Sequence, residues 1–287
     1  MLLPHFIRES KLLRWPLLAL NRAVFSLLRT GPSVIRRATY DAMPVPYIVT
    51  GHPEQFVVET RDRGTGRMLF LTGEQDFWKL EVALAILRAE KLPAPSHLID
   101  VGANIGTIVI PAIKRGLFKT ATAIEPHPGN IRLLRTNLAL NGVDDKVTVL
   151  HQAAGRESHG QLFLHEVEGD SSTHAIGAEG IPVRSSRLDD IDFPSKSLLW
   201  MDIEGYEGHA LDGAKLLLSS GIPVVAEFHP EFLAQSGGTQ AFQHALTNRR
   251  IFDLQSPDRK ETTMDAIHQR LAQKPKRLQW TDILAIA

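Results

Sequence analysis

The sequence of 287 residues contains no cysteine. Disulfide bonds, thiolate metal ligands and a cysteine nucleophile are therefore excluded. An excess of one charge is also missing, because 32 Lys and Arg residues balance 32 Asp and Glu residues. General binding to nucleic acid needs a basic surplus that displaces counterions, so no nucleic-acid partner is predicted. A cysteine-free chain fits a reducing compartment, and we expect a cytoplasmic location.

Long uncharged apolar runs are absent as well. No run approaches the roughly 20 residues that a membrane-spanning helix needs. The runs between Arg14, Arg22 and Arg29 are too short for the core of a signal peptide. Apolar residues make up 43 % and charged residues 22 %, which is ordinary for a globular protein. These values exclude a wholly disordered chain and a polytopic membrane protein.

Basic residues gather at the N-terminus. The first 40 residues carry seven Lys and Arg residues against a single acid, Glu9. Five apolar residues recur there at helical spacing, with most basic residues on the opposite face: Leu13, Leu17, Leu20, Val24 and Leu27. We therefore interpret residues 1–45 as a basic amphipathic arm. Two roles stay open: residues 1–40 rest on an anionic membrane surface, which would give a membrane-associated location, or the arm covers the core or a subunit interface.

Residues 46–96 are predicted to form a hairpin and helix extension. Two β-rich runs within residues 56–72 flank a loop that contains Gly64 and Gly66, which indicates the hairpin. Residues 76–91 carry apolar side chains at helical spacing, which indicates the helix.

Residues 97–287 alternate between strand and helix patterns, which is typical of a parallel sheet with helices on both faces. Seven strands are predicted, at residues 97–102, 121–125, 147–154, 197–205, 223–229, 251–255 and 278–286. Five helices are predicted between them, at residues 105–115, 129–141, 207–220, 240–249 and 263–273. The prediction is one α/β domain with a doubly wound, mostly parallel seven-stranded sheet, in which ligands bind beyond the carboxyl ends of the strands.

The turn after the first of these strands is rich in glycine. Gly102 allows a tight turn and a close approach of the backbone to a ligand. A dinucleotide fingerprint would also need glycine at 104 and 107, but Asn104 and Thr107 stand there, which argues against a pyrophosphate site. Glu125 ends the second strand, where a carboxylate can accept both hydroxyls of a ribose. The pattern predicts an adenosine-type ligand, and the acid alone does not distinguish NAD from S-adenosylmethionine.

Five segments resemble the FkbM family of S-adenosylmethionine-dependent methyltransferases and occur in the family's order. They are IDVGANIG (99–106), AIEPHP (123–128), AAG (153–155), MDIEGYE (201–207) with LDGA (211–214), and VVAEFHPE (224–231). The resemblance implies a Rossmann-like class I methyltransferase fold and S-adenosyl-L-methionine as cofactor. It also implies O-methylation of a hydroxyl on a small molecule, a sugar or a lipid-like metabolite. One departure is Trp200, because the family usually carries a lysine there.

The resemblance also implies roles for individual residues. The methionine part of the cofactor would lie in a pocket shaped by Asp100, Gly102, Asn104 and Gly106. Glu125 would hold the ribose, and Gln152 and Ala153 would border the adenine. Asp202 and Glu204 would lie near the sulfonium and the acceptor.

Methyl transfer to a hydroxyl profits from a general base, because an alkoxide is the better nucleophile. The catalytic candidates after the strands are Asp202, Glu204 and His229, followed by Glu227 and His127. Structural interpretations stay open for them: Glu204 can cap the following helix, His229 can belong to a tight turn, and Glu227 can pair with an arginine.

No metal is predicted, since the twelve histidines contain no H-E-x-x-H pattern, and His165 and His174 fall in a segment expected to be a solvated loop. Two other functions remain open. One is a non-catalytic module of the same fold that holds the cofactor or acts in an interaction. The other is a dinucleotide-dependent oxidoreductase. The expected partner is a small-molecule acceptor, and the sequence predicts no oligomeric state.

Overall fold

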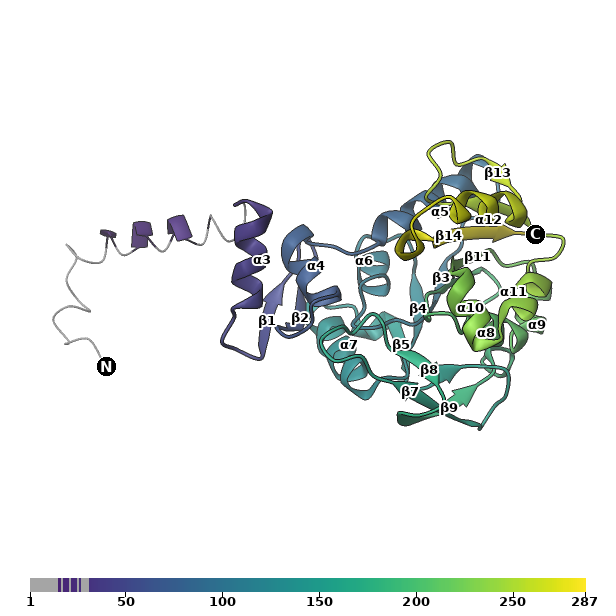
Figure 1. Ribbon diagram of the computed structural model, residues 1–287, viewed down its shortest axis with the longest axis horizontal. Helices are drawn as coiled ribbons and strands as arrows, with labels where there is room; N and C mark the ends of the chain where they lie inside the picture. Colours follow the sequence, from purple (N-terminus) through teal and green to yellow (C-terminus); the bar gives the residue numbers. More distant parts are fainter. Residues whose placement is uncertain (1–14, 17, 21, 25, 27–30) are drawn as a thin grey trace.

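The computed structural model describes residues 15–16, 18–20, 22–24, 26 and 31–287. Within that part of the chain the strands form a two-stranded, an eight-stranded and a four-stranded sheet (Figure 1). The eight-stranded sheet is the centre of the molecule. Its strands are β3 (His97–Val101), β4 (Thr120–Ile124), β5 (Val147–Leu150), β10 (Ser197–Met201), β11 (Val224–Phe228), β12 (Arg250–Asp253), β13 (Glu261–Thr262) and β14 (Thr281–Ile286).

The central sheet has the order β13-β12-β14-β11-β10-β3-β4-β5. Neighbours from β11 to β5 are parallel, and β14 is antiparallel to both β11 and β12. The predicted doubly wound, mostly parallel sheet is therefore confirmed, and the short strand β13 is added at one edge. The strand order reverses between β3 and β10, which is where a sheet of this kind opens a crevice for ligands.

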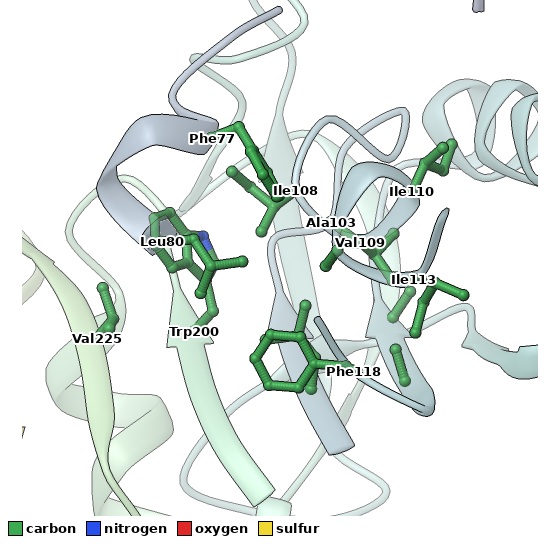
Figure 2. Packing of buried hydrophobic residues seen from close by; sticks show 14 of the residues in the cluster. Phe77, Leu80, Ala103, Ile108, Val109, Ile110, Ile113, Phe118, Trp200 and Val225 are labelled. Carbon is green, nitrogen blue, oxygen red and sulfur yellow. The ribbon is translucent and has the colours of Figure 1, made fainter. Parts of the chain in front are cut away.

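Side chains alternate between the two faces of this sheet. In β10, Leu198 and Trp200 belong to one hydrophobic cluster, and Leu199 and Met201 belong to the other. The first cluster is covered by α5 (Phe77–Ala89), α6 (Val109–Lys114) and α7 (Pro128–Asn141). The second is covered by α8 (Glu207–Asp212), α10 (Pro230–Ser236), α11 (Thr239–Ala245) and α12 (Met264–Ala272). Figure 2 shows the first cluster, with Leu80 of α5 beside Trp200, Phe77 of α5 next to Ile108, and Ile110 and Ile113 of α6 further along.

The predicted strands at 197–205 and 278–286 are shorter in the structure, and three predicted helices differ in extent from the observed ones. The helix expected from residue 105 begins at Val109, which places Pro111 in the first turn, where the missing N–H costs nothing. The helix expected over 207–220 is divided into α8 and α9 (Lys215–Ser219). The division falls at Gly213, where a Cβ would lie 2.1 Å from the carbonyl oxygen of Gly155. The helix expected over 240–249 ends at Ala245 as α11, and α10 precedes it.

The predicted hairpin over residues 56–72 is wrong. The hairpin joins β1 (Tyr47–Thr50) to β2 (Phe56–Glu59), and α4 (Thr65–Thr72) follows. The cause is Asp62, whose carboxylate accepts the N–H groups of Gly64 at 2.9 Å and Gly66 at 3.0 Å. These bonds satisfy donors that a helix N-terminus leaves free, so the second β-rich run becomes helical.

A small second sheet has the order β6-β9-β7-β8. Its strands are β6 (Ala153–Ala154), β7 (Gln161–His165), β8 (Ala175–Gly177) and β9 (Ile181–Ser186). The third predicted strand, 147–154, therefore divides at His151 and Gln152, with β5 in the central sheet and β6 in the small one. In Figure 1 strands β7, β8 and β9 lie together on the side of the domain away from α5 and α12.

The N-terminal arm is described only in part. Leu13, Leu17 and Leu27 of the predicted apolar stripe lie outside the described residues. The described residues between 15 and 26 are helical, and α3 (Ser33–Asp41) follows. Among the described helices, none combines the length and apolar character that crossing a membrane requires. The 3₁₀ helices are η1 (Asp144–Lys146), η2 (Leu188–Asp190) and η3 (Lys276–Leu278).

Candidate active site

A cavity of about 440 Å³ opens at the carboxyl ends of the central strands, a volume typical of small-molecule sites. Its wall contains most of the residues that the sequence singles out: Gly102, Asn104, Glu125, Gln152, Ala153, Asp202, Glu204, Glu227 and His229. Asp100, Gly106 and His127 are not among the described residues that line it. The cavity therefore combines the ends of β3, β4, β10 and β11 in one site.

Gly102 brings the turns after β3 and β10 into contact. Its φ angle is +85°, and a Cβ at this position would lie 2.0 Å from the carbonyl oxygen of Asp202. No side chain fits there, so the backbone itself forms the cavity wall. Gly106 packs closely against α6 at the end of the same turn, because a Cβ there would lie 2.6 Å from Cδ1 of Ile110.

Glu125 and Asn104 form the wall between β3 and β4. One carboxylate oxygen of Glu125 accepts the N–H of Asn104, and the other accepts the N–H of His127, both at 2.8 Å. Asn104 donates from Nδ2 to Oγ1 of Thr65 at 3.1 Å, while its Oδ1 is buried with no hydrogen-bond partner among the described residues. A buried acceptor without a partner costs free energy, so this amide oxygen is poised to bind a ligand donor.

Asp100 lies behind this wall and is 1 % exposed. Burial raises its pKa to about 8, and the charges of Asp202 and Glu125 act in the same direction. The two oxygens of Asp100 have no side-chain hydrogen-bond partner in the described part of the chain. Asp100 therefore supports the turn from within the fold and does not line the cavity.

Three carboxylates, those of Asp202, Glu204 and Glu227, converge at the carboxyl ends of β10 and β11. Burial raises the pKa of Asp202 to about 6, although the ammonium of Lys79 opposes the rise. Burial and the charge of Asp202 raise the pKa of Glu204 to about 9. Burial and the charge of Asp202 also raise the pKa of Glu227 well above the ordinary value of a glutamate. At neutral pH these values predict an ionised Asp202 beside a protonated Glu204.

Glu207 has a structural position next to this group. Its Oε1 accepts the N–H of Ile203 at 2.9 Å and that of Gly205 at 3.4 Å. Glu204 has a positive φ angle of +53°, which few residues other than glycine adopt. Glu207 therefore holds the turn in which Asp202 and Glu204 are presented to the cavity.

His229 and His127 both serve as helix caps. His229 Nδ1 accepts the N–H of Phe232 at 3.3 Å, and the two rings stack at 3.7 Å. Burial lowers the pKa of His229. An Nδ1 that accepts a hydrogen bond leaves the proton on Nε2, so His229 presents a donor. His127 Nδ1 accepts the N–H of Asn130 at 3.2 Å, and its Nε2 lies 2.8 Å from Glu166.

Other wall residues were not predicted from the sequence. His174, expected in a solvated loop, lines the cavity together with Ser171 and Ser172. Their loop is anchored by Asp62, whose Oδ2 accepts the hydroxyl of Ser171 at 2.6 Å. No pattern in the sequence connects residues so far apart.

Lys79, Arg277 and Trp280 complete the wall on the other side. Lys79 is 2 % exposed and interrupts an apolar helix, which is the one sequence signal that could have indicated it. Trp200, which stands where the family usually has a lysine, is 2 % exposed and belongs to the core next to α5 (Figure 2). The indole therefore fills the space beneath α5 and also forms part of the cavity wall.

The residues fit an adenosine-containing cofactor. Gly102 lets the backbone form the wall, Asn104 offers an unused acceptor, and Glu125 directly follows β4, where a ribose would be held. Within the described residues, no group of three or more His, Asp and Glu side chains is placed to hold a metal ion.

Comparison with known proteins identifies the family of the chain. The methyltransferase FkbM domain matches residues 100–256, which is more than half of the chain. No curated protein matches the sequence. A solved structure of methyltransferase FkbM from Methylobacillus flagellatus is 18 % identical with a TM-score of 0.44, and the match covers 91 % of this chain and 60 % of that one.

Two further solved structures are more distant in sequence. An O-methyltransferase from Bacillus cereus in complex with SAH is 12 % identical, with a TM-score of 0.40 and coverage of 78 % of this chain and 96 % of that one. A tRNA m1G37 methyltransferase from M. jannaschii is also 12 % identical, with a TM-score of 0.40 and coverage of 85 % and 55 %. On the match over residues 100–256, the chain belongs to the methyltransferase FkbM domain family.

Proposed function

We propose that the chain is an S-adenosyl-L-methionine-dependent methyltransferase that acts on a hydroxyl of a small-molecule acceptor. The observation that supports this most directly is the contact between the turn at Gly102 and the backbone of Asp202 within one cavity. This contact places the wall expected to bind the cofactor next to the Asp202 carboxylate, which would accept the proton of the acceptor hydroxyl. A sugar or a lipid-like metabolite would meet the same requirement for a hydroxyl.

Residues on one side of the cavity would hold the cofactor. Gly102 and Asn104 would border its methionine part, Glu125 would bind its ribose, and Gln152 with Ala153 would border its adenine. When bound, S-adenosyl-L-methionine supplies a methyl group that is activated by its attachment to a positively charged sulfonium. The protein then has to orient the acceptor and move one proton.

Asp202 is our candidate for the base. A pKa of about 6 leaves its carboxylate mostly ionised at neutral pH, so Asp202 can accept the proton of an acceptor hydroxyl. Glu204, with a pKa of about 9, stays protonated and can hydrogen-bond the acceptor. His229 would donate from Nε2 to an acceptor oxygen, because Nδ1 already caps α10. We therefore assign the base to Asp202 and an orienting role to His229.

The test compares Asp202→Asn and His229→Ala with the unaltered protein. Transfer of a labelled methyl group to compounds of a cell extract measures turnover, and calorimetry measures cofactor binding. We expect Asp202→Asn to lower turnover by roughly 10²- to 10⁴-fold, with cofactor affinity nearly unchanged. If both variants keep the turnover of the unaltered protein, the assignment is wrong.

The same experiment tests the alternatives. Binding of the cofactor without transfer to any extract compound would favour a non-catalytic module. Binding of NAD in preference to S-adenosyl-L-methionine would favour an oxidoreductase. Separate assays with total RNA and with small molecules test the proposal that the acceptor is a small molecule and no nucleic acid.

We also propose that residues 1–40 contact an anionic membrane surface and that the protein acts in the cytoplasm. Support comes from large apolar side chains that are exposed on the described part of the arm, with Trp15 at 73 %, Leu20 at 60 % and Val34 at 76 %. Flotation with anionic liposomes should recover the full chain and lose a version without residues 1–40. Equal recovery of both would contradict the contact.

A further inference from the structure

Lys79 is a buried cation that has no role in the reaction proposed above. Its side chain is 3 % exposed, and Nζ lies 2.9 Å from Asp282 and 3.3 Å from Asp76. The ammonium also lies 4.9 Å from the centre of the Trp280 ring. A buried charge is costly unless it is paired, so this arrangement fixes Lys79 firmly in place.

The ion pair lies in the cavity wall and not in a remote part of the core. Lys79 lines the same cavity as Asp202 and Glu227. Asp282 on β14 is the direct cross-strand partner of Glu227 on β11. Like charges opposite each other across antiparallel strands are unfavourable, and the charge of Asp282 accordingly raises the pKa of Glu227. The ammonium of Lys79 pairs with Asp282 at this edge of the sheet, where the acceptor would bind.

The elements that hold Lys79 are outside the segment that matches the family, residues 100–256. Asp76 and Lys79 belong to the start of α5, while Trp280 and Asp282 belong to the start of β14 and the residue before it. These contacts are therefore a property of this chain's flanking elements. They reach the reaction centre from the side opposite Glu125 and the ribose wall.

The charges around Asp202 come from every neighbouring element. Those that act on it or that respond to it are Asp76 and Lys79 of α5, Asp100 of β3, Glu204 in the turn after β10, Glu207 of α8, Glu227 of β11 and Asp282 of β14. Arg277 of η3 lines the cavity and is exposed. In this acidic surrounding, the charge of Lys79 lowers the pKa of Asp202, whereas burial, Asp282 and Asp76 raise it.

We propose that Lys79 is a positioning residue for methyl transfer: held between Asp76 and Asp282, its ammonium keeps the Asp202 carboxylate charged and able to take the proton of the acceptor hydroxyl. The inference rests on the proposed function, because it assigns Asp202 as the base. The proton passes from the hydroxyl oxygen to the Asp202 carboxylate, and Lys79 keeps its own proton throughout. Burial alone would lower the pKa of Lys79, but the carboxylates of Asp282, Asp76 and Asp202 raise it.

The test is the variant Lys79→Met, which keeps the length of the side chain and removes its charge. A cation near a carboxylate typically lowers the carboxyl pKa by about 1–3 units. We expect the acidic limb of kcat/KM against pH to move to higher pH by about one unit or more. Because the pKa of Asp202 starts at about 6, kcat/KM at about pH 6 should then fall about fivefold or more. The plateau at high pH should stay within a few-fold of the unaltered protein.

A second readout does not depend on turnover. In protein labelled with carbon-13 at aspartate carboxyls, the Asp202 resonance is identified by its loss in Asp202→Asn. Its titration should move to higher pH in Lys79→Met. Lys79→Arg, which restores the charge, should move it back, and Asp76→Asn, which removes a competing carboxylate, should move it to lower pH.

The control is Arg115→Met. Arg115 also pairs with carboxylates, Glu54 at 2.7 Å and Glu74 at 3.1 Å, and lies 4.4 Å from the Phe77 ring, but it is not among the described residues that line the cavity. We expect this variant to lower the unfolding temperature and to leave both pH profiles in place. The inference is overturned if Lys79→Met changes stability alone, with the Asp202 titration unmoved.

The results that would refute the proposed function differ from those that would refute the role of Lys79 alone. If the unaltered protein transfers no methyl group, the role of Asp202 as base is refuted, whatever the titration shows. If the unaltered protein is active and Asp202→Asn is inactive, but Lys79→Met titrates like the unaltered protein, only the role of Lys79 is refuted.

Discussion

Replacing Gly102 by alanine should disrupt the contact on which the site depends. The added Cβ would lie 2.0 Å from the carbonyl oxygen of Asp202 and 2.9 Å from Cγ2 of Ile203. The first of these neighbours is backbone, which cannot rotate away. The turn after β10 must therefore move, and the Asp202 carboxylate moves with it. Adding one methyl group at Gly102 thus tests whether the contact between the turns after β3 and β10 positions the Asp202 carboxylate.

The magnitude follows from two separate costs. A φ angle of +85° is unfavourable for alanine by about 1–2 kcal/mol. Overpacking against a fixed backbone adds about 1–3 kcal/mol. Relief of the overlap needs a shift of about 1 Å at Asp202, and a displacement of that size can lower turnover by about 10²-fold.

Gly142→Ala is the matched control. Gly142 ends α7 with a φ angle of +66°, and its Cβ would meet no described atom within 4 Å. The free energy of unfolding of this variant should fall by about 1 kcal/mol, which is the cost of the backbone conformation alone. Unfolding in denaturant gives both free energies, and calorimetry with S-adenosyl-L-methionine gives both affinities. If Gly102→Ala matches Gly142→Ala in stability and keeps its cofactor affinity, the close approach of the two turns has no functional meaning.

Two further predictions concern the loop anchor and the carboxylates. Asp62→Ala should lower cofactor affinity about tenfold, because the loop that carries Ser171 and lines the cavity loses its attachment to α4. Ser171→Ala should show a smaller loss and spare α4; equal affinity of Asp62→Ala and the unaltered protein would contradict the anchor. Between the ordinary pKa of glutamate and about 9, folded Glu204 holds a proton that unfolded Glu204 has lost, so the unfolding free energy falls as pH rises. Glu204→Gln should remove this contribution and flatten the pH dependence of the unfolding free energy in that range. Denaturant unfolding at several pH values measures the slope, and an unchanged slope would show that Glu204 is ionised in the folded protein.

The central sheet was predictable because its strands are buried on both faces and each is followed by a helix. β3 illustrates this: all five of its residues are buried, so its sequence is apolar throughout apart from His97 and Asp100. Such strands fix the topology almost alone, since right-handed crossovers leave few alternatives. The residues at strand ends, Gly102, Glu125 and Asp202, were found for the same reason. Their place in the sequence determines their place in the cavity.

The hairpin and the loop of the small sheet were not predictable in that way. Residues 65–72 have strand-like side chains, and their helix depends on the carboxylate of Asp62 three residues earlier. The same carboxylate binds Ser171, more than a hundred residues away in sequence. Local patterns carry no information on such a contact, because it forms only after the sheet has brought both segments together.

This difference separates two halves of the active site. The half that is expected to bind the cofactor lies at strand ends and could be identified from residues 100–153. The half that we propose for the acceptor adds Lys79 and Trp280 to the cavity wall, from elements outside the family-matching segment. Membership of the family therefore indicates methyl transfer, whereas we propose that side chains of α5 and of the segment at the start of β14 select the acceptor. The charge state of Asp202 depends on those flanking elements too, so a change of acceptor can proceed by substitutions in α5 and β14 while the cofactor wall stays constant.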